Sequence, residues 1–274
     1  MKHEKISFIG GGNMAKSLIS GMIQSNYPQS LITVSTPHQD KVNLLVEKFK
    51  INGTTDNSLA ATNSDIIVLA IKPQMMQQVL TEMSSSINNF SDKLIISVMA
   101  GVTVNRICQM LPGCSKVIRV MPNTPALIGL GMAGLYASKE CSVNDKTFAD
   151  ELLKSCGKTA WVQNEASIDD ITAISGSAPA YFFLFMECIA NKAKTMGFSE
   201  ADTRTIIEQV ALGSANMVIK NQEKSISELR AAVTSKGGTT FEAIKVFEDK
   251  KLNEIVEKAI DACKNRATEM ATQF

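Results

Sequence analysis

The stretch Lys5–Ala15, KISFIGGGNMA, joins a short apolar run to a helical pattern through three consecutive glycines. This order is typical of the strand, turn and helix that hold a dinucleotide pyrophosphate, with Gly10 in the tight turn and Gly12 beside the phosphates. Ala15 replaces the third glycine of the motif, and free N–H groups at the helix start face the anion. A plain strand-to-helix turn is the alternative reading. The context on both sides favours a dinucleotide-binding loop.

The bulk composition sets limits on the class of protein. The chain has 274 residues, of which 45% are hydrophobic and 20% charged, as in an ordinary soluble protein of about two domains. A net charge of +1 and few aromatic residues give no case for nucleic acid or an acidic membrane as a partner. We therefore expect a small-molecule substrate.

The six cysteines form no C-x-x-C pair, and only two histidines are present, so we expect reduced thiols and no metal. No cleavable apolar segment precedes the first strand. The most apolar helix-length stretch, Tyr181–Ala190, is interrupted by Glu187 and is too short to span a bilayer. These features predict a cytoplasmic protein without a membrane segment.

Strand and helix patterns alternate over residues 1–163, which predicts an α/β fold with a doubly wound Rossmann dinucleotide-binding domain. The expected strands are Ile6–Ile9, Leu31–Val34, Asp65–Ile71, Leu94–Val98 and Val117–Met121, with Met132–Ala137 at an edge and Trp161–Val162 closing the sheet. The expected helices are Asn13–Gln24, Asp40–Phe49, Met75–Met83, Val102–Leu111 and Val143–Ser155.

From residue 164 the strand signals vanish, and apolar residues recur at helical spacing. Residues 164–274 are therefore predicted to form an all-helical second domain for substrate binding and dimerisation. It is small for a self-sufficient core, which suggests an intertwined dimer. The expected helices are Pro179–Met196, Ala201–Lys220, Ser225–Val233, Thr239–Phe247 and Leu252–Met270.

The end of the second strand indicates which cofactor the loop accepts. NAD-preferring sites place Asp or Glu there, whereas this chain has Ser35 and Thr36, whose hydroxyls can donate to a 2′-phosphate. His38 or Lys41 can add positive charge. This favours NADPH, and a neutral site that also accepts NADH is the alternative.

Two further strand ends face the same crevice, at Ala70–Pro73 and Val98–Gly101. Their small residues and the proline turn suit backbone contact with a nicotinamide. Lys72 is the one charged residue there, and a solvated turn lysine is its alternative reading.

The histidines restrict the chemistry. His3 precedes the first strand and His38 falls near the adenosine, so neither is placed to act as the base of an alcohol dehydrogenase. Reduction of an already protonated imine needs little proton transfer from the protein and fits better.

Two polar loops in the second half are candidates for substrate contact. Thr234–Thr240 contains two glycines and opens a helix, so its N–H groups and hydroxyls form a carboxylate cradle or, alternatively, a flexible connector. Ile174–Tyr181 breaks one helix and starts another, and its small residues serve close ligand approach or helix packing.

Six motifs in order give the chain a resemblance to the pyrroline-5-carboxylate reductase family over essentially its whole length. They are Phe8–Ala15, Ile71–Pro73, Ala100–Thr103, Arg119–Pro125, Ser175–Tyr181 and Gly237–Ala243. The resemblance implies NAD(P)H-dependent reduction of 1-pyrroline-5-carboxylate to L-proline, the last step of proline biosynthesis.

The resemblance also implies the site residues. Substrate contacts fall on Ser235, Gly238, Thr239 and Thr240, with Glu165 nearby, and the Thr240 hydroxyl bonds the ring nitrogen. Cofactor contacts fall on Ile9, Gly10, Gly11, Gly12, Asn13, Met14, Thr36, Asn57, Ala70, Ile71, Lys72, Pro73, Met99, Ala100 and Gly101.

The family's second domain forms an intertwined homodimer, and five dimers often assemble into a decamer, which implies an active site shared between subunits. The chain departs from the family at Lys236, where proline is common, and at Ala178, where glycine is common. Neither departure removes a motif.

Two other functions, a β-hydroxyacid dehydrogenase and a non-catalytic dinucleotide sensor, are the alternatives. A β-hydroxyacid dehydrogenase needs a lysine on the first long helix of the second domain, with an asparagine four residues on. That helix has only Lys192 and Lys194 at its far end, without such an asparagine. A non-catalytic dinucleotide sensor is the third reading, and the intact Ser235–Thr240 loop argues against it.

Overall fold

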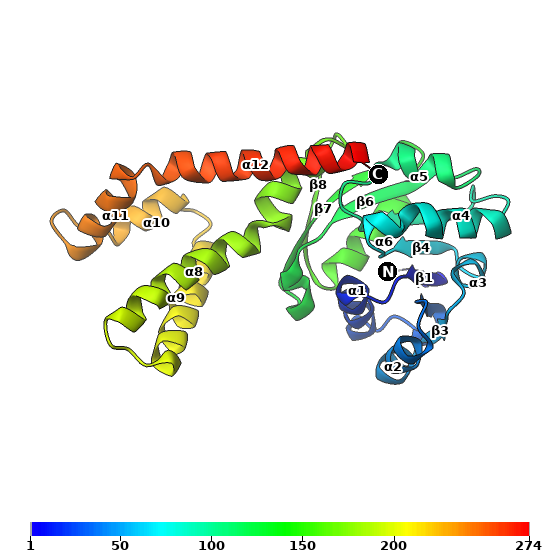
Figure 1. The fold of residues 1–274 in the computed structure, drawn as a ribbon, viewed down its shortest axis with the longest axis horizontal. Helices are drawn as coiled ribbons and strands as arrows, with labels where there is room; N and C mark the ends of the chain where they lie inside the picture. The colour runs from blue at the N-terminus through cyan, green and yellow to red at the C-terminus, as the bar shows by residue number, and fades with distance from the viewer. Residues whose placement is uncertain (1, 274) are drawn as a thin grey trace. The chain divides into compact units, whose positions relative to one another are not determined.

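The computed structural model describes residues 2–273 and divides the chain into two compact units (Figure 1). The first runs to Pro179 and takes up the chain again from Ala262, and the second is Ala180–Asp261. The returning chain is tied to the first unit by hydrogen bonding of Thr268 Oγ1 to Asp169 Oδ2, at 3.3 Å. The compact units thus divide the chain differently from residues 1–163 and 164–274.

Within residues 2–273, one eight-stranded sheet forms the centre of the first unit, in the order β3-β2-β1-β4-β5-β6-β7-β8. Neighbouring strands are parallel except β6 and β7, which are antiparallel. The predicted doubly wound fold is confirmed. The strands are β1 (Ile6–Ile9), β2 (Ile32–Ser35), β3 (Asn52–Thr54), β4 (Ile66–Leu69), β5 (Leu94–Ser97), β6 (Val117–Met121), β7 (Gly131–Ala137) and β8 (Gly157–Trp161).

The edges of the sheet differ from the prediction. β3 was not predicted, because its sequence, Asn-Gly-Thr, lacks an apolar pattern; it forms by pairing with β2, where Thr33 faces Asn52. β8 begins at Gly157 rather than at Trp161, so β7 is covered by it and is not an edge strand.

Helices cover both faces of the sheet. On one face, α1 (Asn13–Gln24), α2 (Gln39–Phe49) and α6 (Val143–Lys154) pack on a core that includes Phe8. On the other, α3 (Asn57–Thr62), α4 (Met76–Ser86) and α5 (Val104–Met110) pack on a core that includes Ile67. Strands buried on both faces explain the continuous apolar runs in the sequence.

The strand register aligns the carboxyl ends on one edge of the sheet. Ile9 of β1 lies between Ser35 of β2 and Leu69 of β4, and Leu69 pairs with Ser97 of β5. The loops that follow these strands therefore share one crevice, where the connections from β1 and β4 leave in opposite directions.

After β8 the described chain is helical, as predicted. A π-helical turn, Thr172–Gly176, separates α7 (Ser167–Ile171) from α8 (Ala178–Thr195). Ser199 caps α9 by accepting from Asp202 N, and Ser225 forms a capping box with Glu228 at α10. The remaining helices are α9 (Glu200–Lys220), α10 (Ile226–Ala232), α11 (Thr239–Asp249) and α12 (Leu252–Gln273).

The second unit exposes its apolar side chains. Among its described residues no hydrophobic side chain is buried; Phe182 is 65% exposed and Ile226 is 70% exposed. The helical run Ser167–Thr195 has 29 residues and a mean hydropathy of 1.4 in its most apolar window, enough by length and composition to cross a membrane. The helical run is longer than the stretch Tyr181–Ala190 considered in the sequence, because α7, the π-helical turn and α8 follow one another directly.

Candidate functional site

The glycine loop after β1 is held in a conformation that only glycine adopts easily. Gly10 has a φ of +105°, and its N–H donates to Ser35 O at 2.8 Å. A Cβ on Gly10 would lie 2.5 Å from the carbonyl oxygen of Ala70. β1 and β4 therefore approach closely at the point where the loop turns.

The start of α1 is open to a ligand. Gly12 is the N-cap residue of α1, and no side chain caps the N–H groups there. A Cβ added at Gly12 would meet no atom within 4 Å. The first N–H groups of a helix have no partner within the helix, and its dipole favours an anion. The empty space at Gly12 and the uncapped helix thus fit a pyrophosphate.

At the end of β2 the structure joins two residues predicted on different grounds. The hydroxyl of Ser35, which is fully buried, donates to Asn57 Oδ1 at 2.8 Å. Ser35 therefore orients Asn57, at the start of α3, and its hydroxyl proton is not directed at a phosphate. Thr36 follows with 6% exposure, and its N–H donates to Thr54 O.

The two other strand-end loops lie where the sequence predicted them. Lys72 is exposed and precedes Pro73, which begins the 3-10 turn η2 (Pro73–Met75). Gly101 has a φ of +72°, and the side chain of Met99 is buried in the core on one face of the sheet.

An ion pair holds Glu165 next to this edge of the sheet. Glu165 Oε1 accepts from Arg119 Nη1 at 2.8 Å and from Val104 N at 2.7 Å. Arg119 belongs to β6 and is only 4% exposed, so its side chain has little freedom to move. The carboxylate thereby joins β6, the start of α5 and the segment before α7.

Arg119 and Asn123 belong to one of the six motifs, but the sequence alone indicates no role for either residue. Asn123 donates to Ser175 O at 3.2 Å and accepts from Met132 N at 2.9 Å, which fixes the π-helical turn to β7. Gly176 lies against Met121, since a Cβ would be 2.5 Å from Met121 Cε. The role of Arg119 could have been suspected from the sequence, because it is the one charged residue in the otherwise apolar strand β6.

In the second unit the predicted loop forms a turn that leads into α11. Gly237 has a φ of +74°, and Gly238 N donates to Ser235 O at 3.0 Å. Gly238 is the N-cap of α11 without a side-chain cap, and Thr239 and Thr240 are exposed in its first turn. Their hydroxyls and the open N–H groups lie together at the helix start, where the sequence predicts carboxylate binding, and that role stays a prediction.

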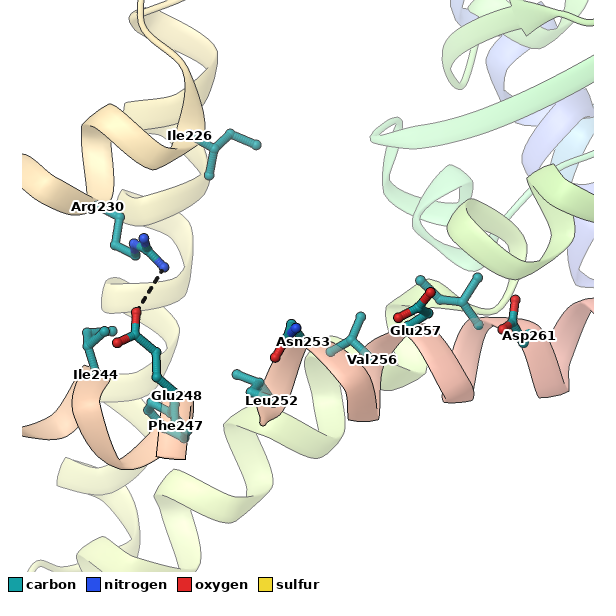
Figure 2. A pocket seen from close by; sticks show the side chains of 11 residues that line it. Ile226, Arg230, Ile244, Phe247, Glu248, Leu252, Asn253, Val256, Glu257 and Asp261 are labelled. Atoms are coloured by element: carbon teal, nitrogen blue, oxygen red, sulfur yellow. Dashed lines mark ion pairs between the residues drawn. The ribbon is translucent and has the colours of Figure 1, made fainter. Parts of the chain in front are cut away.

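The second unit also contains a groove of about 1050 Å³ between α10, α11 and the start of α12 (Figure 2). Arg230 and Glu248 face one another across it at 3.9 Å, and the other lining side chains are mainly apolar, among them Ile226, Phe247 and Val256. None of the predicted site residues lines this groove. Among residues 2–273, no group of three or more His, Cys, Asp or Glu is arranged to hold a metal.

Two family models match the chain in the same order as the two predicted domains. Residues 5–101 match a family described as NADP oxidoreductase, coenzyme F420-dependent, and residues 165–270 match pyrroline-5-carboxylate reductase dimerisation.

Curated relatives and solved structures agree with these matches. Pyrroline-5-carboxylate reductases of Vibrio alginolyticus and Haemophilus influenzae are 44% and 42% identical to the chain, over all of each chain. A pyrroline-5-carboxylate reductase structure from Coxiella burnetii has a TM-score of 0.91 at 38% identity, covering 98% of this chain and 99% of that one. The Plasmodium falciparum pyrroline carboxylate reductase with NADP bound has a TM-score of 0.87 at 28% identity, covering 99% of both chains.

Proposed function

The chain belongs to the pyrroline-5-carboxylate reductase family, and we propose that its first unit binds the cofactor and its second unit binds the substrate. Its function is NAD(P)H-dependent reduction of 1-pyrroline-5-carboxylate to L-proline, the last step of proline biosynthesis. The glycine loop at the junction of β1 and α1 is the observation that supports cofactor binding most directly. There, Gly10 fits only as glycine, and Gly12 leaves an open cradle.

In the proposed site the first unit binds the cofactor. The N–H groups at the start of α1 bind the pyrophosphate, Asn57 and Thr36 lie at the adenosine ribose, and the loops after β4 and β5 hold the nicotinamide. The cofactor, when bound, supplies a hydride from the nicotinamide C4. NADPH is preferred because the end of β2 carries no carboxylate to repel a 2′-phosphate.

The second unit binds and orients the substrate. The N–H groups at the start of α11, with the hydroxyls of Ser235 and Thr239, bind the carboxylate of the pyrroline ring. The Thr240 hydroxyl bonds the ring nitrogen, which aims the imine carbon. Glu165, which Arg119 holds by a hydrogen bond, is assigned to the neighbourhood of the substrate, as the family resemblance implies.

A second copy of the chain completes the second unit. The exposed apolar residues of Ala180–Asp261 and the groove of Figure 2 are interpreted as the face that this copy covers, because the model matching residues 165–270 describes dimerisation. The apolar run Ser167–Thr195 is assigned to that interface rather than to lipid for the same reason. We further propose a cytoplasmic enzyme in which five dimers form a decamer.

A turnover assay tests the proposal. Purified protein is expected to oxidise NADPH with 1-pyrroline-5-carboxylate and to be silent with 2-hydroxy acids. Turnover only of a hydroxy acid would indicate a β-hydroxyacid dehydrogenase, and NADPH binding without turnover would indicate a sensor. Either result contradicts the proposal.

Replacing Thr240 tests its role in orienting the imine. Thr240→Ala is expected to lower kcat by about tenfold or more, with the NADPH dissociation constant nearly unchanged, because a directed hydrogen bond to the reacting nitrogen is lost. Thr205→Ala, which removes an exposed hydroxyl from α9, is the control. Equal turnover in Thr240→Ala and the control would refute the role.

A further inference from the structure

Two cysteines of the first unit, which the proposed reaction does not use, lie next to each other. Cys108 is on α5, and Cys114 follows the turn that leads from α5 to β6. Their sulfur atoms are 3.8 Å apart and share a hydrogen bond. The thiols of Cys141 and Cys156 instead lie against oxygen atoms of the backbone.

The two sulfurs have unequal surroundings. Cys108 is half-buried, whereas Cys114 is buried in the core that covers one face of the sheet. The hydrogen bond between the two sulfurs lowers the pKa of Cys108, and the same hydrogen bond together with burial raises the pKa of Cys114. The more accessible sulfur is therefore also the better nucleophile, and the buried one keeps its proton.

Between the two cysteines the chain completes α5 at Met110 and then turns over residues 111–113. Gly113 has a φ of +75°, and both Pro112 and Gly113 are exposed. A disulfide needs a sulfur separation of about 2 Å, which requires rotation of the two side chains and a small adjustment of this turn. Cys108 lies in the last turn of α5 and Cys114 precedes β6, so the adjustment falls at the end of the helix and outside the strand.

We propose that Cys108 and Cys114 form a peroxide-reactive dithiol site, with Cys108 attacking and Cys114 resolving. The Cys108 thiolate attacks one oxygen of hydrogen peroxide, the O–O bond breaks, and the leaving hydroxide takes a proton to become water. Cys114 sulfur then attacks the sulfenic acid on Cys108, the S–O bond breaks, and a second water leaves with the Cys114 proton. Two thiols are oxidised to one disulfide, and one peroxide is reduced to two waters.

The sequence provides a direct readout. Trypsin cleaves after Arg106 and Lys116, so both cysteines fall in the single peptide Ile107–Lys116. After brief treatment of the whole protein with hydrogen peroxide, this peptide is expected to lose two hydrogens in mass and to take up no alkylating reagent. Dithiothreitol is expected to restore two alkylation sites. The peptides that carry Cys141 and Cys156 serve as internal controls, because burial raises the pKa of both thiols.

Two variants separate the roles of the sulfurs. Cys114→Ser is expected to leave Cys108 as a sulfenic acid that dimedone labels, since no resolving thiol remains. Cys108→Ser is expected to leave Cys114 unlabelled and about tenfold or more slower to oxidise, because Cys114 remains buried, which limits access of peroxide and disfavours the thiolate. Equal oxidation of the two variants, or a peptide 107–116 that stays fully alkylated while other cysteine peptides are oxidised, would overturn the proposal. The readout does not depend on the reductase reaction.

Discussion

The two units of this chain treat apolar side chains in opposite ways. Around the sheet, residues such as Phe8 and Ile67 are fully buried by the chain's own helices. In Ala180–Asp261, Phe182 and Ile226 are mostly exposed. Burial of a large apolar side chain stabilises by roughly 1.5–3 kcal/mol, so the second unit forgoes a large stabilisation unless another surface covers it. The first unit buries its own core, whereas the exposed apolar face of the second unit is proposed to be one side of a dimer interface.

The two glycine-rich loops show the same contrast. Gly10 is fixed by a hydrogen bond to β2 and by close contact with the backbone after β4. The turn at Gly237–Gly238 is held by local contacts with Ser235. We therefore expect the loop at Gly10 to be ordered before the cofactor binds. The turn at Gly237–Gly238 is expected to become ordered when the substrate binds.

The largest effect is expected from a charge on the exposed apolar face. Phe182→Asp would place a carboxylate in the dimer interface, once per subunit, and is expected to raise the dimer dissociation constant by about a thousandfold or more. Sedimentation velocity measures it. The control is Val143→Asp, which changes an even more exposed apolar residue at the start of α6 and is expected to leave the dimer intact. A dimer of unchanged stability in Phe182→Asp would remove the contrast between the units.

Substitutions at two glycines of the cofactor loop should affect thermal stability and NADPH binding differently. Gly12→Ala is expected to leave the Tm of the cofactor-free protein unchanged, since the added Cβ meets nothing, while weakening NADPH binding by about a hundredfold. Gly10→Ala is expected to lower the Tm even without cofactor, because of its positive φ and the contact with Ala70. Calorimetry and fluorescence titration measure both. If Gly12→Ala lowered the Tm as much as Gly10→Ala, the inference that the space at Gly12 is open for the cofactor would be contradicted.

The free energy of unfolding should depend on pH through Tyr27, a buried residue of the first unit. Burial raises the pKa of Tyr27 to about 12, and its hydroxyl donates to Glu4 O. The unfolded chain loses this proton near its ordinary value of 10.0, so the stabilising contribution is present below pH 10 and is lost as pH rises to about 12.

Two pKa units correspond to roughly 2.7 kcal/mol in the free energy of unfolding. Urea unfolding at several pH values should therefore show the advantage of wild type over Tyr27→Phe shrinking above pH 10. Tyr136→Phe is the control. An advantage of wild type over Tyr27→Phe that stays constant to pH 12 would contradict the assignment.

The smallest effect concerns the choice between NADPH and NADH. Thr36→Asp adds a carboxylate at the end of β2 and is expected to lower kcat/KM for NADPH by about tenfold, with little change for NADH. Thr36→Asn has nearly the same shape without the charge and is the matched control. Equal losses with both cofactors would show that Thr36 does not face the 2′-position.

The long, strongly patterned elements could be predicted from the sequence. β1, α1 and the helices after residue 164 follow apolar periodicity and capping residues such as Ser199, which are local signals. β3 could not be predicted, because its three residues become a strand only by pairing with β2. For the same reason the start of β8 was placed too late.

The site was predicted in part. The backbone of the glycine loop follows from the order of residues, and the structure places it at the junction of β1 and β4. The direction of a side chain does not follow from that order. Ser35 was expected to offer its hydroxyl to a phosphate, but it donates to Asn57, which lies 22 residues further along the chain. The role of Arg119 depends on Glu165, which is 46 residues away.

The sequence by itself determined the dinucleotide-binding fold, the helical second half and the family, because these depend on periodicity and on motifs of neighbouring residues. Only the tertiary structure decided that Arg119 holds Glu165, that Cys108 lies against Cys114, and that the second unit exposes its apolar face. Those features depend on which distant segments pack together, and packing is set by the burial of the whole chain rather than by any one stretch of it.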